Sequence, residues 1–378
     1  QVSLSHAAIT PSQHITPDVA FYIQQLFLAT GNREWLERSG YAILKGVADW
    51  IVSRVQQVQG GHFAINKVFP VDEWCSDDQT HCHSQGVNND AQMNAVSRVA
   101  LYAAANASAL LNYAIDDKWL EVAENLLLQR NTSTNVVQQF DNFTRDLPPN
   151  SYICPEDVLY LAYPLGESLH WTDAMSQANA EYYTPITCQE NAGMTAPIHT
   201  IVWLGAGRPD MAGTQLARGM LAACYGPFHV RNEVDMHQDI IGGHFTNSHF
   251  VTGDGGFVQS IVNGYMGVRL SPHVEGVTVL SGVSPLSPRQ LRKPQLPPDV
   301  SHLQLSGLHV RDWSLSLSLD PTVLNVTLTN TTLSDATIET VCLVDNVGVT
   351  TPLPSDVPVA ISLHSFAFPA KVVACKGN

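Results

Sequence analysis

Two stretches of the sequence gather carboxylates that could carry out acid–base chemistry. The first, "FPVDEWCSDDQTHCHSQGVNNDAQMN", runs from Phe69 to Asn94, and the second, "VRNEVDMHQDIIGGHFTNSHFVTGDGGFVQ", covers residues 230–259. Glu73 follows a Pro-x-Asp turn and precedes Trp74, an apolar neighbour able to desolvate its carboxyl and raise its pKa, as a general acid requires. Glu233 lies in the second stretch. Two carboxylates on separate loops at one end of a helical body suit glycoside hydrolysis, in which one protonates the leaving oxygen and the other activates water.

The first stretch has two alternative interpretations, a metal site and a solvated acidic loop. His81, Cys82 and His83 are adjacent, so their side chains diverge, and zinc-type spacings are missing from the chain. Asp77 and Asp78 are explained as solvated turn residues. We therefore expect no metal and no cofactor. A metal-dependent enzyme is the alternative, with ligands drawn from His81, His83, His237, His244 and His249.

The glycine-rich "TGDGG" before residue 257 could present backbone N–H groups at the start of a helix. It lacks the Gly-Lys-Ser/Thr of a nucleotide-binding P-loop, which argues against a nucleotide. We expect Gly255 and Gly256 to contact substrate instead.

The composition restricts the class of ligand. The chain has 378 residues, of which 44% are hydrophobic and only 14% charged, with 19 basic against 34 acidic side chains. The acidic balance disfavours nucleic acid and anionic membranes, and a neutral, hydroxyl-rich ligand fits it better. No apolar run is long enough to cross a bilayer, and no signal peptide stands at the start, so we expect a soluble chain whose signal peptide, if any, lies upstream.

Sequons and cysteines indicate a secreted protein or one in a lysosome-like or vacuole-like lumen. The Asn-x-Ser/Thr sequons begin at Asn106, Asn131, Asn142, Asn325 and Asn330. The seven cysteines show no Cys-x-x-Cys spacing, and their odd number leaves one thiol free or paired outside this chain. Cys342 and Cys375 are the predicted disulfide of the last third, and Cys75 and Cys82 could close a small loop.

Helix signals fill the first two thirds of the chain. A helix is expected from Thr16 as N-cap and Pro17 to Gly31, with one apolar face made by Val19, Ile23, Leu26 and Phe27. A second helix should run from residue 33 to Gly60–Gly61 and form an antiparallel hairpin with the first. His14 and Asp18, four residues apart, could pair across one turn. Trp50, Trp203 and Tyr265 are expected in the core.

The remaining sequence divides into an excursion, more helices and a β domain. Residues 131–170 are Asn- and Pro-rich and are expected on the surface, and helices follow to about residue 270. Beyond a Pro-rich connector, "WSLSLSLD" and "VLNVTLTNTT" alternate with period two. The predicted fold is mainly α with a β appendage: residues 1–270 helical, 271–298 a connector and 299–378 a small antiparallel β-sandwich.

Three ordered motifs resemble glycoside hydrolase family 65, the family of acid trehalases, kojibiose and maltose phosphorylases, and protein-glucosylgalactosylhydroxylysine glucosidases. "HITPDVAFYIQQLFLATGN" resembles its helix with a His-x-x-x-Asp pattern. "FPVDEW" with "GVNNDAQMNAV" resembles its Pro-Asp-Glu-Tyr and Val-(Asp/Asn)-Asn-x-x-x-Thr-Asn elements. "TGDGGFVQSIVNGYMGVRL" resembles the Thr-Gly-x-Gly-Gly-Phe-x-Gln element that ends its (α/α)6 barrel.

The resemblance implies roles for individual residues. Glu73 becomes the general acid, Glu233 the general base of an inverting hydrolase, and Trp74, Asn89 and Asn94 line the sugar pocket. The Lys-Glu-Gly-Ile-His loop of the family's phosphorylases has no counterpart here, which favours hydrolysis of a short glucoside or glycan, of glucosyl-galactosyl-hydroxylysine or trehalose type.

Departures from the family pattern leave an alternative. The Trp-Asp-x-Glu element is absent, Trp74 replaces a Tyr and Met93 replaces a Thr. The resemblance therefore implies an incomplete (α/α)6 toroid that an N-terminal fragment of the same precursor would complete, covering helix faces left bare. The alternative function is a catalytically inactive secreted glycoprotein of the same fold with a sugar-binding or structural role.

Overall fold

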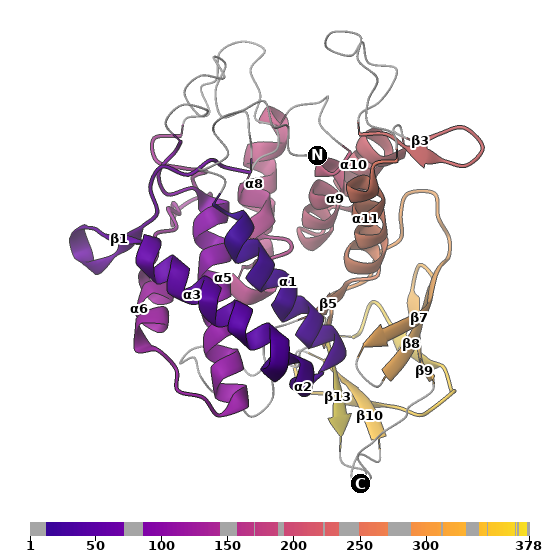
Figure 1. The fold of residues 1–378 in the computed structure, drawn as a ribbon. Coiled ribbons are helices and arrows are strands. Elements are labelled where there is room, and N and C mark those ends of the chain that lie inside the picture. Colours follow the sequence, from indigo (N-terminus) through magenta and orange to yellow (C-terminus); the bar gives the residue numbers. More distant parts are fainter. Residues whose placement is uncertain are drawn as a thin grey trace.

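The computed structural model describes residues 13–71, 86–143, 157–169, 171–187, 193–221, 224–233, 249–270, 289–310, 313–329, 340–345, 347–366, 368 and 370–375. Helices occupy the first two thirds of the chain and most strands the last third (Figure 1). The helices are α1 (Ile15–Thr30), α2 (Arg33–Trp35), α3 (Tyr41–Arg54), α5 (Ala91–Leu111), α6 (Asp117–Asn125), α7 (Gly166–Leu169), α8 (Asp173–Tyr183), α9 (Thr195–Gly205), α10 (Pro209–Gln215) and α11 (Val251–Gln259). Shorter helical turns are η1 (Leu36–Gly40), η2 (Gln59–Gly61), η3 (Val158–Leu161), η4 (Thr184–Ile186), η5 (Leu216–Leu221) and η7 (Ser260–Tyr265).

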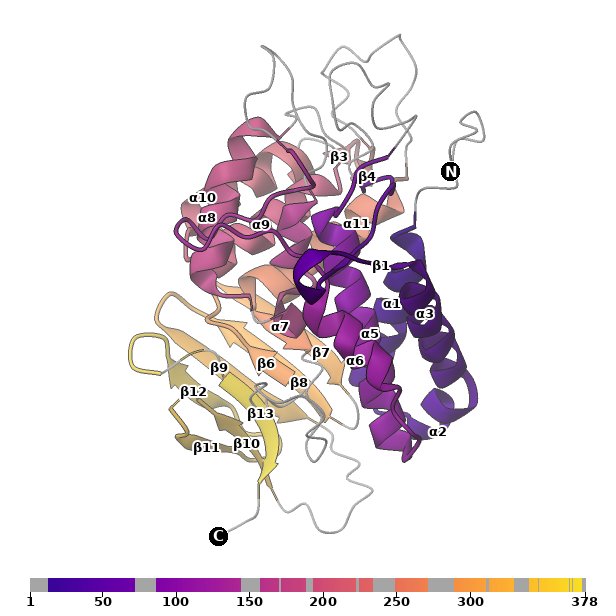
Figure 2. The same ribbon diagram turned by 90° about the vertical axis from the view of Figure 1, so that its left-hand side faces the viewer.

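The predicted first helix and its hairpin partner are present. α1 begins at Ile15 with His14 as its N-cap, two residues before the predicted cap, and ends at Gly31, whose φ of 65° suits glycine. α1 and α3 lie side by side in Figures 1 and 2, and α2 and η1 lead directly into α3.

α3 is shorter than the predicted second helix and ends at Arg54. The chain becomes extended at Val55, and β1 (Gln56–Gln57) pairs with β2 (Phe63–Ala64) across a glycine turn. Backbone pairing therefore takes over about five residues before the glycines that were expected to stop the helix.

α5 is the inner helix around which α1, α3, α6 and η3 pack. Side chains on all its faces are buried, as expected for a helix that other elements surround. Its alanines allow the neighbouring helices to approach closely, and Trp119 of α6, 2% exposed, fills the space beside it.

Part of the predicted surface excursion is in the core. Val158, Leu159 and Leu161 of η3 are fully buried, which corrects the expectation for residues 131–170. This short apolar run packs against α5, α8 and α9. It was not recognised in the sequence because the segments on either side of it are rich in Asn and Pro. Trp203 and Tyr265, at 2% and 0% exposure, are core residues as predicted, and Trp50 packs against the core while remaining partly exposed.

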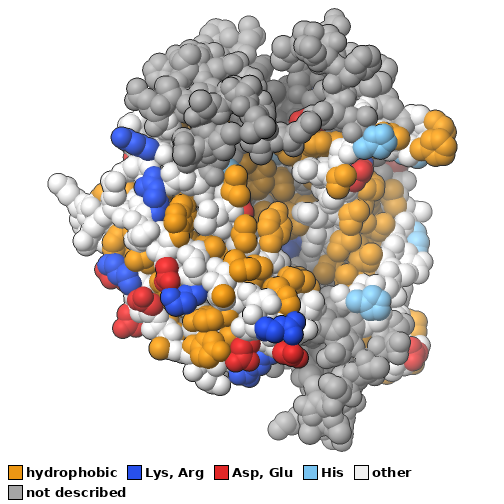
Figure 3. Space-filling model, viewed as in Figure 1, with side chains coloured by type: hydrophobic (Ala, Val, Ile, Leu, Met, Phe, Trp, Pro, Cys, Tyr) orange, Lys and Arg blue, Asp and Glu red, His pale blue; other side chains and the backbone are white. Residues whose placement is uncertain are grey.

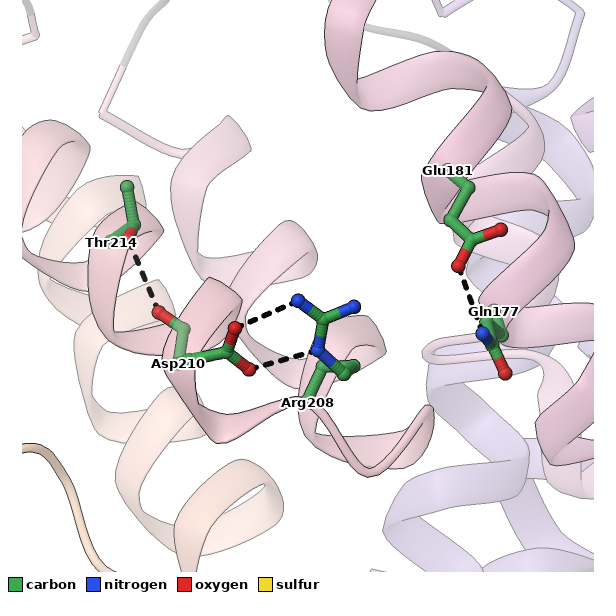
Figure 4. A network of polar contacts seen from close by, with 5 residues as sticks. All are labelled: Gln177, Glu181, Arg208, Asp210 and Thr214. Atoms are coloured by element: carbon green, nitrogen blue, oxygen red, sulfur yellow. Dashed lines mark hydrogen bonds and ion pairs between the residues drawn. The ribbon is translucent and has the colours of Figure 1, made fainter.

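Figure 4 shows two sets of polar contacts, one on α8 and one at the start of α10, and their side chains are largely exposed to solvent. Arg208 donates from Nε and Nη2 to the carboxylate of Asp210 at 3.0 and 2.7 Å, and this hydrogen bonding lowers the pKa of Asp210 to about 2. Gln177 donates to Glu181 on α8. Exposed pairs of this kind are screened by water, so we assign them no catalytic role.

The last third forms two antiparallel sheets that share one apolar core (Figure 2). The sheet orders are β11-β10-β13-β6-β5 and β12-β9-β8-β7. The strands are β5 (Val268–Leu270), β6 (Arg289–Leu291), β7 (Leu303–Val310), β8 (Trp313–Leu319), β9 (Val323–Thr329), β10 (Thr340–Val344), β11 (Thr350–Leu353), β12 (Val359–Ser362) and β13 (Ala370–Cys375). The predicted period-two segments are strands, and their alternate leucines face the core. β5 and β6 join this unit from positions before residue 299, while the domain boundaries themselves stay a prediction.

Within the described part of the chain, no helix is both long and apolar enough to cross a membrane.

Candidate active site

A cleft of about 520 Å³ lies between α1 and α11, with α5 and α9 behind it. In Figure 3 hydrophobic side chains gather on both sides of this hollow in the surface. Its lining combines apolar walls with hydroxyl, amide and charged groups: His14, Asp18, Phe21, Tyr22, Gln25, Val71, Gln92, Tyr160, Tyr163, Pro164, Leu165, Met194, Pro197, Ile198, Thr252, Gly256, Gln259, Asn263, Arg269 and Leu270. A mainly apolar lining with a small number of polar groups that point into the same space is typical of a small-ligand site.

Polar side chains of α1 and α5 are tied together at the cleft. His14 Nδ1 and Asp18 Oδ2 lie 2.9 Å apart, which confirms the predicted pair, and Gln92 Nε2 donates to Asp18 Oδ1 at 3.2 Å. A carboxylate held this way from both sides is oriented in advance for a ligand hydroxyl.

A second polar group of the cleft comes from Tyr163, Gln259 and Arg269. The Tyr163 hydroxyl donates to Gln259 Oε1 at 2.8 Å, and the Arg269 guanidinium lies 5.0 Å from the ring centroid. Burial raises the pKa of Tyr163 to about 12, against the opposing effect of Arg269. Tyr163 therefore acts as a hydrogen-bonding group and not as a phenolate.

The stretch carrying Glu73 is anchored at the start of α5. Val68 and Val87 exchange two backbone hydrogen bonds of 2.9 and 2.8 Å, which close the base of this excursion. Gly86 has φ +67°, and a Cβ there would lie 2.7 Å from the Val68 carbonyl oxygen, so only glycine fits without a shift. Glu73 and Trp74 lie outside the described residues. Val71 lines the cleft, and two residues span at most about 7 Å.

Glu233 follows β4 (Val230–Arg231), which pairs with β3 (Cys224–Tyr225). Glu233 is half-buried, and its carbonyl oxygen accepts the N–H of Gly193 at 2.5 Å. Met194, which follows Gly193 in the chain, lines the cleft. The backbone at Glu233 is therefore fixed beside the same cleft that Val71 reaches.

Arg231, two residues before Glu233, pairs with Asp254 of α11. Its Nε lies 3.0 Å from Asp254 Oδ1 on α11, and its guanidinium lies 5.5 Å from the Phe257 ring centroid. Arg231 is only 4% exposed, so it fixes α11 against β4, the strand that ends two residues before Glu233.

Asn89 and Asn94 are buried next to the cleft and do not line it. Asn89 Nδ2 donates to both carboxylate oxygens of Asp141, at 3.2 and 3.0 Å. Asn94, fully buried, donates to the Leu127 carbonyl at 2.9 Å. Both side chains stabilise the start of α5, and their contact with a sugar stays a prediction.

The glycines of "TGDGG" lie inside α11 and not in a loop before it. A Cβ on Gly256 would meet Pro197 Cγ at 2.5 Å, so this glycine permits close packing of α11 on α9, while Gly255 faces open space. The amide N–H of Asp254 is used within the helix, bonded to the Phe250 carbonyl. The glycine-rich segment is therefore part of the helix and not a loop before it, and Gly256 lines the cleft. The contact of Gly255 and Gly256 with substrate stays a prediction.

Gln92, Tyr163 and Gln259 are among the cleft residues that sequence reasoning missed. Gln92 and Gln259 lie within the motifs quoted above, and membership of those motifs is the only sequence feature that could have marked them as site residues. Nothing in the sequence marked Tyr163, since a lone tyrosine in an irregular stretch carries no periodic pattern.

The predicted modification sites fall in different environments. Asn131 and Asn142 are exposed, whereas Asn106 within α5 and Asn325 within β9 are half-buried, and Asn330 lies outside the described residues. Cys342 is disulfide-bonded. Cys375 pairs with Thr340 in the strand register and thus lies diagonal to Cys342 on the same face. Its side chain, like Cys75 and Cys82, lies outside the described residues, so both pairings stay predictions.

Among the described residues, no group of three or more His, Cys, Asp or Glu side chains is arranged to hold a metal ion. His81, His83, His237 and His244 lie outside the described residues, and His249 stands just before α11.

Comparison with known proteins shows similarity to glycoside hydrolase family 65. Residues 4–152 match the glycosyl hydrolase family 65 central catalytic domain. A kojibiose hydrolase of Mucilaginibacter mallensis is 30% identical over 274 residues, covering 72% of this chain and 36% of that protein. A protein-glucosylgalactosylhydroxylysine glucosidase of Dictyostelium discoideum is 28% identical over 262 residues, covering 68% of this chain and 33% of that protein.

The fold is shared with a solved structure assigned as a kojibiose phosphorylase from the human microbiome. The TM-score is 0.65 at 15% identity, and the match covers 92% of this chain and 49% of that one. The chain thus spans about a third of the length of these two curated relatives and half of the solved structure.

Proposed function

We propose, from the premise that this chain belongs to glycoside hydrolase family 65, that it forms the active site of an inverting hydrolase releasing glucose from a short α-glucoside. The observation that carries the proposal is the convergence of two segments on one cleft. Val71, two residues before Glu73, and Met194, next to the residue bonded to Glu233, both line it.

The proposed mechanism uses one carboxyl group on each side of the glycosidic bond. Glu73 donates its proton to the glycosidic oxygen as the bond to the anomeric carbon breaks. Glu233 takes a proton from water as the water oxygen bonds to the opposite face of that carbon. Inversion needs the two carboxyl groups roughly 6.5–9.5 Å apart, so that one water fits between them.

The cleft lining supports a neutral sugar as the ligand. Asp18 and Gln92 offer an acceptor and an amide to sugar hydroxyls, and Tyr22 and Tyr163 offer aromatic rings. The proposed substrates are glucosyl-galactosyl-hydroxylysine, trehalose and kojibiose, of which the last is suggested by the name of the bacterial relatives. The missing phosphorylase loop favours water over phosphate as the acceptor.

The test is glucose release by the protein, with any polypeptide that co-purifies, in phosphate-free buffer. Glu73→Gln and Glu233→Gln should each lower kcat by about 10²–10⁴, the usual contribution of general acid–base catalysis. Asp78→Asn, a matched change in the same loop, should leave the rate unchanged. NMR of the first product should show β-glucose.

Several outcomes would contradict the proposal. Undiminished release by Glu73→Gln would remove the general acid, and initial α-glucose would replace inversion by retention. Glucose 1-phosphate formed only with phosphate would mean phosphorolysis. A folded protein that binds these glucosides but releases no glucose would favour the inactive glycoprotein.

We further propose that an amphipathic helical segment of the same precursor covers the face between α1 and α11. Ile15, Val19, Tyr22 and Leu26 form a stripe on α1 that is 42–69% exposed, and Val251 and Val258 of α11 are 77% and 57% exposed. Apolar stripes at helical spacing normally face a partner. The relatives have more than half their length outside the matched region, which leaves them chain to fill such a face.

Co-expression with the upstream segment of the precursor tests this partner. The two polypeptides should co-elute in gel filtration, and Val19→Asp with Leu26→Asp should separate them. Val357→Asp, equally exposed on the β domain, should not. An unchanged elution volume with and without the upstream segment would disprove the contact.

The exposed sequons and the disulfide-bonded Cys342 support a proposal of residence outside the cell or in a lysosome-like lumen.

A further inference from the structure

Two buried carboxyl groups meet at the start of α5. Asp90 is the N-cap of this helix, and its Oδ1 accepts the backbone N–H of Met93 at 2.7 Å. Its carboxyl is also hydrogen-bonded to that of Asp157, which stands immediately before η3. Both residues are 0% exposed.

A hydrogen bond between two carboxyl groups requires a proton on one of them, because an ionised carboxylate has no hydrogen to donate. Burial favours the neutral form further, and desolvation is the largest cause that raises the pKa of Asp90. The pair therefore titrates as a unit that carries one proton and one negative charge.

The charged groups around this end of α5 come from α1 and from the segment that follows α6. His14 of the α1 N-cap acts on Asp90 and opposes the rise in its pKa. Asp18 of α1 accepts from Gln92, and Asp141, after α6, accepts from Asn89.

We propose that Asp90 and Asp157 share one proton, and that this pair holds the start of α5, with Asn89 and Gln92, in place for the cleft. Asp157 is thus a positioning residue. The catalytic consequence rests on the function proposed above, whereas the shared proton does not. Above the pKa of the pair, two buried negative charges would repel, and η3 and α5 would separate.

The sign of the pH effect follows from the raised pKa. The unfolded chain loses this proton near the ordinary Asp pKa, while the folded protein keeps it to higher pH. The stabilisation from this proton is fully present below the ordinary Asp pKa. Above that pKa the folding equilibrium constant falls tenfold per pH unit until the raised pKa of the pair is reached.

The test compares wild type with Asp157→Asn by urea unfolding from about pH 4 to about pH 9. The new amide donates to Asp90 and reproduces the charge of the proton-sharing pair, but it cannot lose that proton. The folding equilibrium constant of wild type, divided by that of the variant, should fall tenfold per pH unit up to the raised pKa of the pair and stay constant above it. Asp117→Asn, the same change at an exposed site on α6, should give a constant ratio.

A ratio of wild type to Asp157→Asn that stays constant over this range would overturn the proposal, since a plain structural hydrogen bond gives that result. If Asp157→Asn does not fold, Asp90→Asn serves instead, because asparagine also caps helices. The alkaline limb of kcat/KM should move to higher pH in the variant. Unfolding is read without substrate, so the shared proton can stand even where no glucosidase activity is found.

Discussion

Gly86→Ala tests whether the Val68–Val87 bridge holds the stretch that carries Glu73. The residue has φ +67°, and the left-handed conformation alone costs an L-residue about 1–2 kcal/mol. The added Cβ would also lie 2.7 Å from the Val68 carbonyl oxygen, a backbone atom that cannot turn away. Opening the bridge would lose two hydrogen bonds, each worth about 0.5–1.5 kcal/mol net. The expected loss of unfolding free energy is therefore about 2–5 kcal/mol.

Gly61→Ala is the matched control for this experiment. Gly61 has φ +81°, yet nothing lies within 4 Å of its Cβ position, so only the conformational cost of about 1–2 kcal/mol applies. Both variants are unfolded in urea at equal protein concentration and compared at unchanged m value. If Gly86→Ala is no less stable than Gly61→Ala, the bridge does not constrain the base of this stretch. Glucose release should fall in Gly86→Ala alone, because only that change moves the proposed acid.

The other predictions use neighbouring contacts. Gly256→Ala should destabilise the fold by about 1–3 kcal/mol through overpacking against Pro197, whereas Gly255→Ala, in open space on the same helix, should be neutral or stabilise by about 0.5–1 kcal/mol, as urea unfolding would show. Asn94→Ala should cost about 1–3 kcal/mol, measured in the same way, because it removes the hydrogen bond from the fully buried Asn94 side chain to the partly buried Leu127 carbonyl. Asn131→Gln and Asn142→Gln should each lower the mass of the secreted protein by one glycan, and Asn106→Gln, half-buried in α5, should not.

Local signals in the sequence predicted the elements well and their ends less well. α1 ends at the predicted Gly31 because the left-handed residue after a helix has a strong preference for glycine. The predicted end of α3 was wrong. The chain leaves the helix after Arg54 to form a two-residue β pairing, and the pairing partner cannot be identified from the local apolar period. The short buried run in η3 was missed since its four residues are too few to establish a period.

The site was predictable only to the extent that motifs named its residues. His14 and Asp18 pair as their spacing indicates. The second partner of Asp18, Gln92 on α5, could not be predicted because this contact is set by how α1 packs on α5. Gly256, expected to contact substrate, lines the cleft, and it also leaves room for Pro197, a packing role that the motif did not indicate. Backbone motifs thus located the cleft, while tertiary packing decided which side chains enter it.

The apolar residues of α1 also show how tertiary packing decides which side chains are buried. Val19, Ile23, Leu26 and Phe27 were grouped as one apolar face, yet Val19 and Leu26 are 42% and 46% exposed, while Phe27 is buried. Periodicity counts apolar positions and cannot tell which neighbour covers them, so a helix apolar over more than one face yields a merged stripe. α1 therefore has an inner face that packs on α3 and α5, and an outer stripe beside the cleft. If that stripe binds a helical segment, the same contact would form the missing wall of the cleft, and substrate affinity would depend on the partner as strongly as stability does.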